Sequence, residues 1–168
     1  GVIAFEGAYH GLGYGALSTT HRNHFRSPFK KQLSKFSHFA PFPITAKELI
    51  ETETQLEVIL KNHPIGAMLV EPIQGRAGLR VPPAKFLRML RSLCDQHDAL
   101  LVYDEIYTGF GRTGEWFASD YYGLKPDLMP IAKGLSSGYL PIGGVMVADH
   151  ITRVIIEEGG EFAHGMTY

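Results

Sequence analysis

The sequence predicts an α/β protein with a mostly parallel sheet flanked by helices. Three observations support this class: short strands that are apolar at every position, amphipathic helix-length segments between some of them, and charged residues directly after several strands. Strands buried on both faces read as continuous apolar runs, whereas half-exposed strands alternate. With 168 residues, 45% of them hydrophobic, the chain is long enough to form a substantial core.

Five apolar runs are predicted to be strands, and two segments between them are predicted to be helices. The strands are residues 2–5, 65–70, 99–103, 128–131 and 142–148. The first helix opens at a capping-box pattern, Thr45 to Glu48, and ends near residues 62–64. The second starts after prolines 82–83, since proline is favoured in a first helical turn. Residues 25–43 have no clean period and are predicted to run irregularly over the surface.

Charge and cysteine content limit the expected partners and location. The formal net charge is −1, so no overall basic field indicates nucleic acid. The basic stretch 21–31 is interpreted as a solvated surface in preference to a phosphate-binding patch. The single cysteine, Cys94, fits a reducing, cytoplasmic compartment and is predicted to be a core thiol of the second helix. No apolar run reaches the length of a membrane-spanning helix, and no signal peptide opens the chain.

Three charged residues follow predicted strands, where α/β proteins bind ligands. Glu71, Asp104 and Lys133 come at or just past strand ends. In open α/β sheets the ligand lies beyond the carboxyl ends of the strands, so a shared site is expected. A single acidic residue often ends a strand only because the chain returns to water, but three such placements favour a site. Burial of Lys133 would lower its pKa and leave a neutral, nucleophilic amine.

Other motifs argue against several common classes of enzyme. Residues 109–114 match G-x-G-x-x-G, but no helix of the required length follows, so a dinucleotide site is disfavoured. The eight histidines are scattered without metal-binding spacing, and no metal is expected. A serine hydrolase is not supported, because the sequence has no G-x-S-x-G elbow.

An amine nucleophile, a carboxylate and a loop aromatic together favour an aldehyde cofactor with a flat ring. Pyridoxal phosphate needs a lysine to form a Schiff base and an acid to keep its ring nitrogen protonated. Lys133 and Asp104 are candidates for these two roles. Tyr9, beside His10 in a glycine-flanked loop, is either a packing residue or an aromatic face for the ring.

The motifs around these residues resemble those of class III aminotransferases, pyridoxal phosphate enzymes of fold type I. The matching segments are residues 5–11, 71–75, 101–114, 125–127, 132–135 and 164–168. The resemblance runs over nearly the whole chain in the right order. It implies that residues 1–168 are a partial cofactor-binding large domain, without the family's N-terminal segment and C-terminal small domain. Both ends look cut, and we expect this piece alone to have little or no activity.

Carried over position by position, the resemblance implies a role for each candidate. Lys133 would hold pyridoxal 5'-phosphate as a Schiff base and move the proton between the substrate Cα and the cofactor's C4′. Asp104 would pair with the pyridinium nitrogen. Tyr9 would stack on one face of the ring and Ile106 would pack on the other. His10 would support the Tyr9 loop.

Three further positions concern the assembly and the substrate. Thr167 matches the threonine that reaches the phosphate of the neighbouring subunit, which implies a homodimer with the site at the interface. Glu71 lies beside the cofactor region, and its role stays open. Family members acting on 4-aminobutyrate or ornithine often carry a glutamate where this chain has Arg76. This departure argues against those two substrates and leaves either an exposed structural arginine or a contact with a substrate carboxylate.

The function expected is transamination, in which an amino acid or ω-amino compound donates its amino group and a 2-oxo acid accepts it. An aminomutase or racemase that uses the same lysine is an alternative within the fold. A non-catalytic nucleotide- or phosphate-binding module built around the glycine-rich loop is the alternative from another class.

Overall fold

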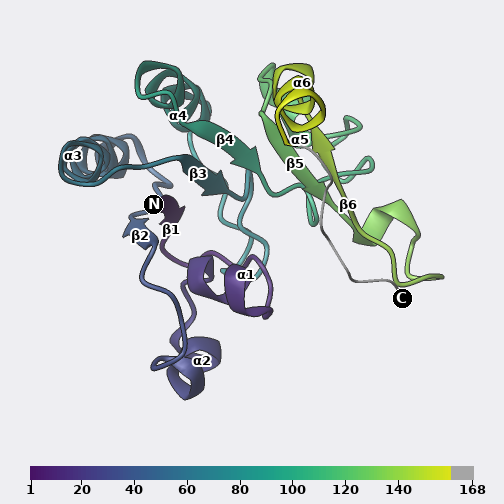
Figure 1. Cartoon of the computed structure of the whole chain (residues 1–168), viewed down its shortest axis with the longest axis horizontal. Helices are drawn as coiled ribbons and strands as arrows, with labels where there is room; N and C mark the ends of the chain where they lie inside the picture. Colours follow the sequence, from purple (N-terminus) through teal and green to yellow (C-terminus); the bar gives the residue numbers. More distant parts are fainter. Residues whose placement is uncertain (160–168) are drawn as a thin grey trace.

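The computed structural model describes residues 1–159, and a six-stranded sheet forms the centre of this part of the chain. The strands are β1 (Val2–Phe5), β2 (Ser37–Ala40), β3 (Ala67–Val70), β4 (Leu100–Tyr103), β5 (Leu128–Ile131) and β6 (Gly144–Val147). They lie in the order β2-β1-β3-β4-β5-β6, and every neighbouring pair is parallel except β5 with β6 (Figure 1). The predicted α/β class with a mostly parallel sheet is confirmed.

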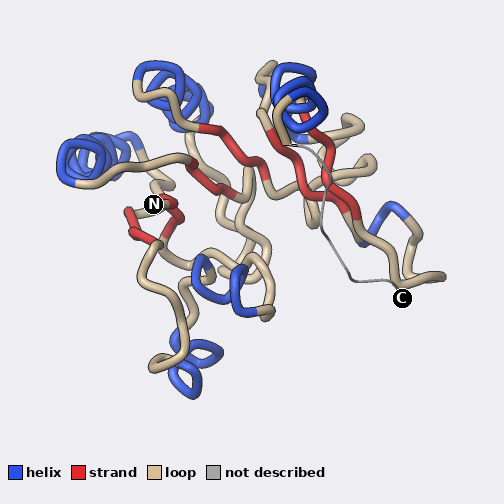
Figure 2. Tube along the Cα trace, viewed as in Figure 1, coloured by secondary structure: helices blue, strands red, loops and turns tan. Residues whose placement is uncertain are grey.

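Helices lie on both sides of this sheet. They are α1 (Tyr14–Thr19), α2 (Asn23–Arg26), α3 (Ala46–Asn62), α4 (Ala84–Gln96), α5 (Ala118–Tyr122) and α6 (Asp149–Glu157), with short 3₁₀ helices η1 (Ser27–Phe29) and η2 (Lys133–Leu135). In Figures 1 and 2, α3, α4 and α6 run along the upper side of the sheet, and α1 and α2 lie below it. None of the helices in residues 1–159 is both long and apolar enough to cross a membrane.

Both long helices begin where the sequence predicts, and α3 also ends where predicted. Thr45 accepts a hydrogen bond from the Glu48 N–H at 3.2 Å, and Glu48 accepts one from the Thr45 N–H at 3.1 Å. This reciprocal capping box satisfies two backbone donors at the start of α3. Helix α4 begins directly after its N-cap Pro83 and buries its apolar side.

The core lies between the sheet and helices α3 and α4. Phe5 of β1 meets Phe86 of α4 edge to face, with ring centroids 5.1 Å apart. Leu56 of α3 is fully buried in the same cluster. Cys94 is also fully buried, and loss of hydration raises the pKa of its thiol to about 12, which confirms the predicted core thiol.

The structure differs from the sequence prediction at the two ends of the sheet. Residues 25–43 are not irregular throughout, because β2 pairs in parallel with all of β1. An edge strand with polar and half-buried residues gives no alternating pattern, which is why the sequence conceals it. The last strand, β6, is exposed at every position despite its apolar sequence. Helices α1 and α6 were not predicted either.

Candidate active site

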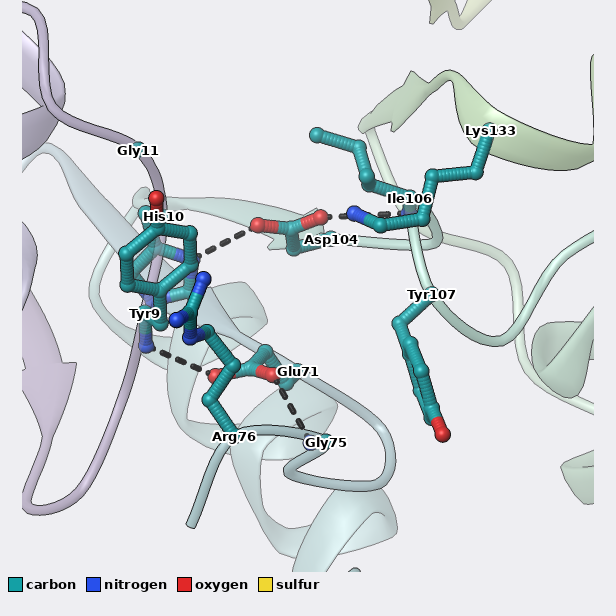
Figure 3. A pocket seen from close by; sticks show the side chains of 10 residues that line it. All are labelled: Tyr9, His10, Gly11, Glu71, Gly75, Arg76, Asp104, Ile106, Tyr107 and Lys133. Carbon is teal, nitrogen blue, oxygen red and sulfur yellow. Dashed lines mark hydrogen bonds and ion pairs between the residues drawn. The ribbon is translucent and has the colours of Figure 1, made fainter. Parts of the chain in front are cut away.

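The loops after four neighbouring parallel strands meet at one pocket. Because β1, β3, β4 and β5 are adjacent and parallel, their carboxyl ends lie along the same edge of the sheet. The pocket is lined by Tyr9, His10, Gly11, Glu71, Gly75, Arg76, Asp104, Ile106, Tyr107 and Lys133 (Figure 3). Its volume is about 310 Å³, which is in the range of small-molecule sites.

Asp104 is the buried carboxylate at the base of this pocket, immediately after β4. It is 5% exposed. Its Oδ2 lies 2.7 Å from Nδ1 of His10, and its Oδ1 accepts a hydrogen bond from the Ile106 N–H at 3.1 Å. An ionised carboxylate can only accept, so His10 donates through Nδ1. The histidine therefore fixes the orientation of the carboxylate.

Glu71 connects the loop after β1 to the loop after β3. Its Oε1 accepts a hydrogen bond from the Tyr9 N–H at 2.8 Å, and its Oε2 accepts one from the Gly75 N–H at 3.1 Å. Burial raises the pKa of this carboxyl above its ordinary value, and the two backbone donors act in the opposite direction. Glu71 thus holds the Tyr9 loop with one oxygen and the Gly75 loop with the other.

Arg76 shares a wall of the pocket with Tyr9. Its guanidinium carbon lies 4.5 Å from the centroid of the Tyr9 ring and 5.6 Å from that of Phe25. Its backbone carbonyl accepts a hydrogen bond from the Arg22 side chain at 2.6 Å. Figure 3 shows the guanidinium of Arg76 next to the ring of Tyr9.

Lys133 starts η2, directly after the loop that leaves β5, and extends over the end of the pocket that contains Asp104 and Ile106 (Figure 3). Its backbone has φ +42°, a left-handed conformation that is rare for residues other than glycine and costs about 1–3 kcal/mol. The expectation of a buried amine is wrong for this structure, because Lys133 is exposed. The tight turn presents its side chain at the open side of the pocket.

The glycine-rich loop after β4 packs against the turn of Lys133. A Cβ atom at Gly134 would lie 2.7 Å from the Cβ of Phe110, closer than real side chains approach. Glu105 holds the far end of this loop: it is fully buried and accepts hydrogen bonds from the N–H groups of Ala118 and Ser119 at 3.1 and 2.7 Å. The loop therefore supports η2 from outside the pocket.

The structure brings together six of the seven predicted site residues. Tyr9, His10, Glu71, Asp104, Ile106 and Lys133 all line the pocket. The seventh, Thr167, lies outside the described residues. Sequence reasoning did not name Gly11, Gly75 or Tyr107 as lining residues, although all three lie in segments that resemble the family. It also missed the side-chain contact of His10 with Asp104, which joins residues 94 positions apart.

No metal centre is formed within residues 1–159. No three His, Cys, Asp or Glu side chains of this part of the chain are grouped to hold an ion.

A pocket of this kind, at the carboxyl edge of a parallel sheet, defines a cofactor-binding α/β domain. The family model for class III aminotransferases matches residues 1–168. Putrescine–pyruvate aminotransferase of Pseudomonas aeruginosa is 51% identical over 127 residues, which are 76% of this chain and 27% of that protein. Acetylornithine aminotransferase of Methanopyrus kandleri is 40% identical over 167 residues, which are 99% of this chain and 39% of that protein.

A solved structure that resembles this chain is also that of a transaminase. The amine transaminase from an uncultivated Pseudomonas species, in its PLP-bound form, has a TM-score of 0.92 and 31% sequence identity, over 99% of this chain and 41% of that one. The chain belongs to the class III aminotransferase family, whose cofactor is pyridoxal 5'-phosphate (PLP). It spans well under half the length of these relatives.

The pocket fits this cofactor on observations of the structure itself. Each oxygen of the buried Asp104 accepts one hydrogen bond and keeps capacity for another, which suits a protonated ring nitrogen. Tyr9 and Ile106 supply an aromatic and an aliphatic wall for a flat ring. Lys133 brings an amine to the same pocket.

Proposed function

We propose that the whole protein to which this chain belongs is a PLP-dependent transaminase, which passes an amino group from an amino acid or ω-amino compound to a 2-oxo acid. The observation that carries the proposal is one pocket that contains the Lys133 amine and the buried Asp104 carboxylate held by His10. The putrescine and acetylornithine relatives suggest two donor types, a diamine and an amino acid.

Each pocket residue has a distinct task in this proposal. PLP supplies an electron sink that stabilises negative charge at the substrate Cα. Asp104 keeps the ring nitrogen protonated, and His10 orients Asp104. Tyr9 and Ile106 hold the ring between them. Lys133 would hold the cofactor through its amine and would move a proton to and from the substrate Cα.

The placement of the chain within the whole protein is also a proposal. We infer that residues 1–168 are the central part of a large cofactor-binding domain, since they span 39% and 41% of two relatives. We further propose a homodimer, in which Thr167 contacts the phosphate bound in the neighbouring subunit. A 168-residue chain expressed alone is then expected to show little or no transamination.

Replacing Lys133 with alanine in the whole protein tests the function. Lys133→Ala should abolish the visible absorbance of lysine-bound cofactor and lower the transamination rate on the order of a thousandfold or more, because attachment and proton transfer both depend on this amine. Lys85→Ala, on exposed α4 surface, is the control and should keep both signals.

Three results would contradict the proposal. Absence of bound cofactor in the wild-type protein would favour a phosphate- or nucleotide-binding module. Interconversion of a single substrate without a 2-oxo acid acceptor would identify a mutase or racemase. Unchanged absorbance and an unchanged transamination rate in Lys133→Ala would show that Lys133 is not part of the active site.

A further inference from the structure

Arg76 is a cation of the pocket wall without an acidic partner among residues 1–159. The ion pairs of this part of the chain involve Asp104, Asp127 and Asp95, and none includes Arg76. Both oxygens of Glu71, the other acid of the pocket, already accept backbone N–H groups. The guanidinium charge of Arg76 is thus not neutralised by a carboxylate from this part of the chain.

The residue is exposed, and its side chain lies against two aromatic rings. Its guanidinium lies over Tyr9 at 4.5 Å and near Phe25 at 5.6 Å, and Arg22 fixes its backbone carbonyl at 2.6 Å. A guanidinium that interacts with aromatic rings through its π-system keeps N–H donors available at its edge. Those donors form a planar fork that matches a carboxylate with two parallel hydrogen bonds.

Arg76 and Lys133 come from different loops, those after β3 and β5, and both line the same pocket (Figure 3). A substrate that reacts beside Lys133 can therefore present its other end to Arg76. A carboxylate at that end would gain a charge-assisted contact, and an ammonium would meet a like charge.

We propose that Arg76 determines the substrate class by recognising a carboxylate at the end of the substrate away from the reacting nitrogen, and by disfavouring a second ammonium there. This inference rests on the proposed transaminase function and adds the identity of the substrate's distal group to it. An ω-amino acid is then a better donor than a diamine of the same length.

The test uses the whole cofactor-loaded protein and three donors that differ only at the distal end: 5-aminopentanoate, pentylamine and cadaverine. Single-turnover kinetics of amino transfer to the cofactor give kcat/KM for each donor. The wild type should prefer 5-aminopentanoate. Arg76→Met should lower kcat/KM for 5-aminopentanoate by about 10- to 100-fold, change that of pentylamine little, and raise that of cadaverine.

Two controls make the result specific to the charge. Arg76→Lys keeps the charge but loses the planar fork, and should retain part of the preference. Arg88→Met removes an exposed arginine of α4 and should leave all three donors unchanged. Calorimetric binding of glutarate, which cannot react, should weaken in Arg76→Met and stay unchanged in Arg88→Met.

The outcomes separate this inference from the proposed function. Equal losses for all three donors, with unchanged glutarate binding, would show that Arg76 only supports the Tyr9 wall and would overturn the inference. An unchanged donor preference in Arg76→Met would also overturn it. If the wild type transfers nitrogen from none of the donors tested but binds glutarate through Arg76, the proposed function fails while the recognition of carboxylate stands.

Discussion

A single buried carboxylate, Glu71, sets the spacing between two walls of the pocket. Its oxygens accept the N–H groups of Tyr9 and Gly75, so the aromatic loop after β1 and the loop of Arg76 after β3 are joined through one side chain. The charge of Glu71 is held in a poorly hydrated place, and burial is the main reason that its pKa is raised. Glu71 therefore fixes the two loops relative to each other, and the burial of its charge lowers the stability of the fold.

The raised pKa of Glu71 predicts how stability depends on pH. A carboxyl whose folded pKa lies above its unfolded value favours folding below the unfolded pKa, and this contribution is lost as pH rises through the folded pKa. The Tm of the cofactor-free wild type, relative to Glu71→Gln, should therefore fall from acidic pH, below the ordinary value of 4.5, toward neutral pH. Thermal unfolding at a series of pH values measures this difference.

Glu57→Gln is the control for that experiment, because Glu57 is exposed on α3. The difference in Tm between the wild type and Glu57→Gln should not fall as the pH rises from acidic to neutral. A flat or rising difference for Glu71→Gln would contradict the prediction.

The residues recovered from the sequence were those marked by their position after a strand. Asp104 and Lys133 are charged residues that follow apolar runs. Partners could not be predicted, because His10 and Asp104 lie 94 positions apart. The exposure of Lys133 could not be predicted either, since it depends on the left-handed backbone of a single turn.

Elements with local signals were predicted, and elements that depend on a partner were not. Helix α3 is marked by its capping box and apolar face, and β4 by a continuous apolar run. Strand β2 exists because β1 offers it a parallel hydrogen-bonding edge, and nothing in its own four residues requires an extended conformation. The order of the strands likewise follows from long-range packing.

The capping box of α3 predicts a measurable loss. Thr45→Ala should lower stability by about 1 kcal/mol, because the Glu48 N–H loses its acceptor. Hydrogen exchange at the first turn of α3 should become faster in the variant. Thr45→Ser should retain most of the protection.

Thr54→Ala provides a matched comparison within the same helix. The Thr54 hydroxyl only donates to the carbonyl of Ile50 in the helix interior, so its loss should leave exchange at the first turn unchanged. Equal acceleration in both alanine variants would show that the cap is not the cause.

Across the whole molecule, the β6 and α6 end differs from an ordinary surface. Val145 and Met146 of β6 are 57% and 47% exposed, and Ile156 of α6 is 73% exposed. Apolar side chains exposed at every position of a strand and on the following helix are typical of a place where other protein packs. We propose that segments of the whole protein outside this chain cover it, in keeping with its span of 39% of one relative.

Two valines that are equally exposed in this chain should therefore respond differently to a charge. Val145 of β6 is 57% exposed and Val58 of α3 is 55% exposed. In the whole protein, Val145→Lys should lower the free energy of unfolding by roughly 3 kcal/mol, because it buries an unpaired charge. Val58→Lys should leave the free energy of unfolding nearly unchanged. Chemical unfolding of both variants measures this, and equal effects would contradict the covered surface.

The packing of Phe110 against Gly134 has a consequence for redesign of the proposed transaminase. Phe110 packs against Gly134 in the turn of Lys133 and does not line the pocket, and a Cβ atom at position 134 would lie 2.7 Å from the Phe110 Cβ. Any larger residue at position 134 would therefore push the turn of Lys133 away from Phe110 and shift the amine, while every residue that lines the pocket stays as it is. Libraries aimed at bulkier substrates have a reason to include this position.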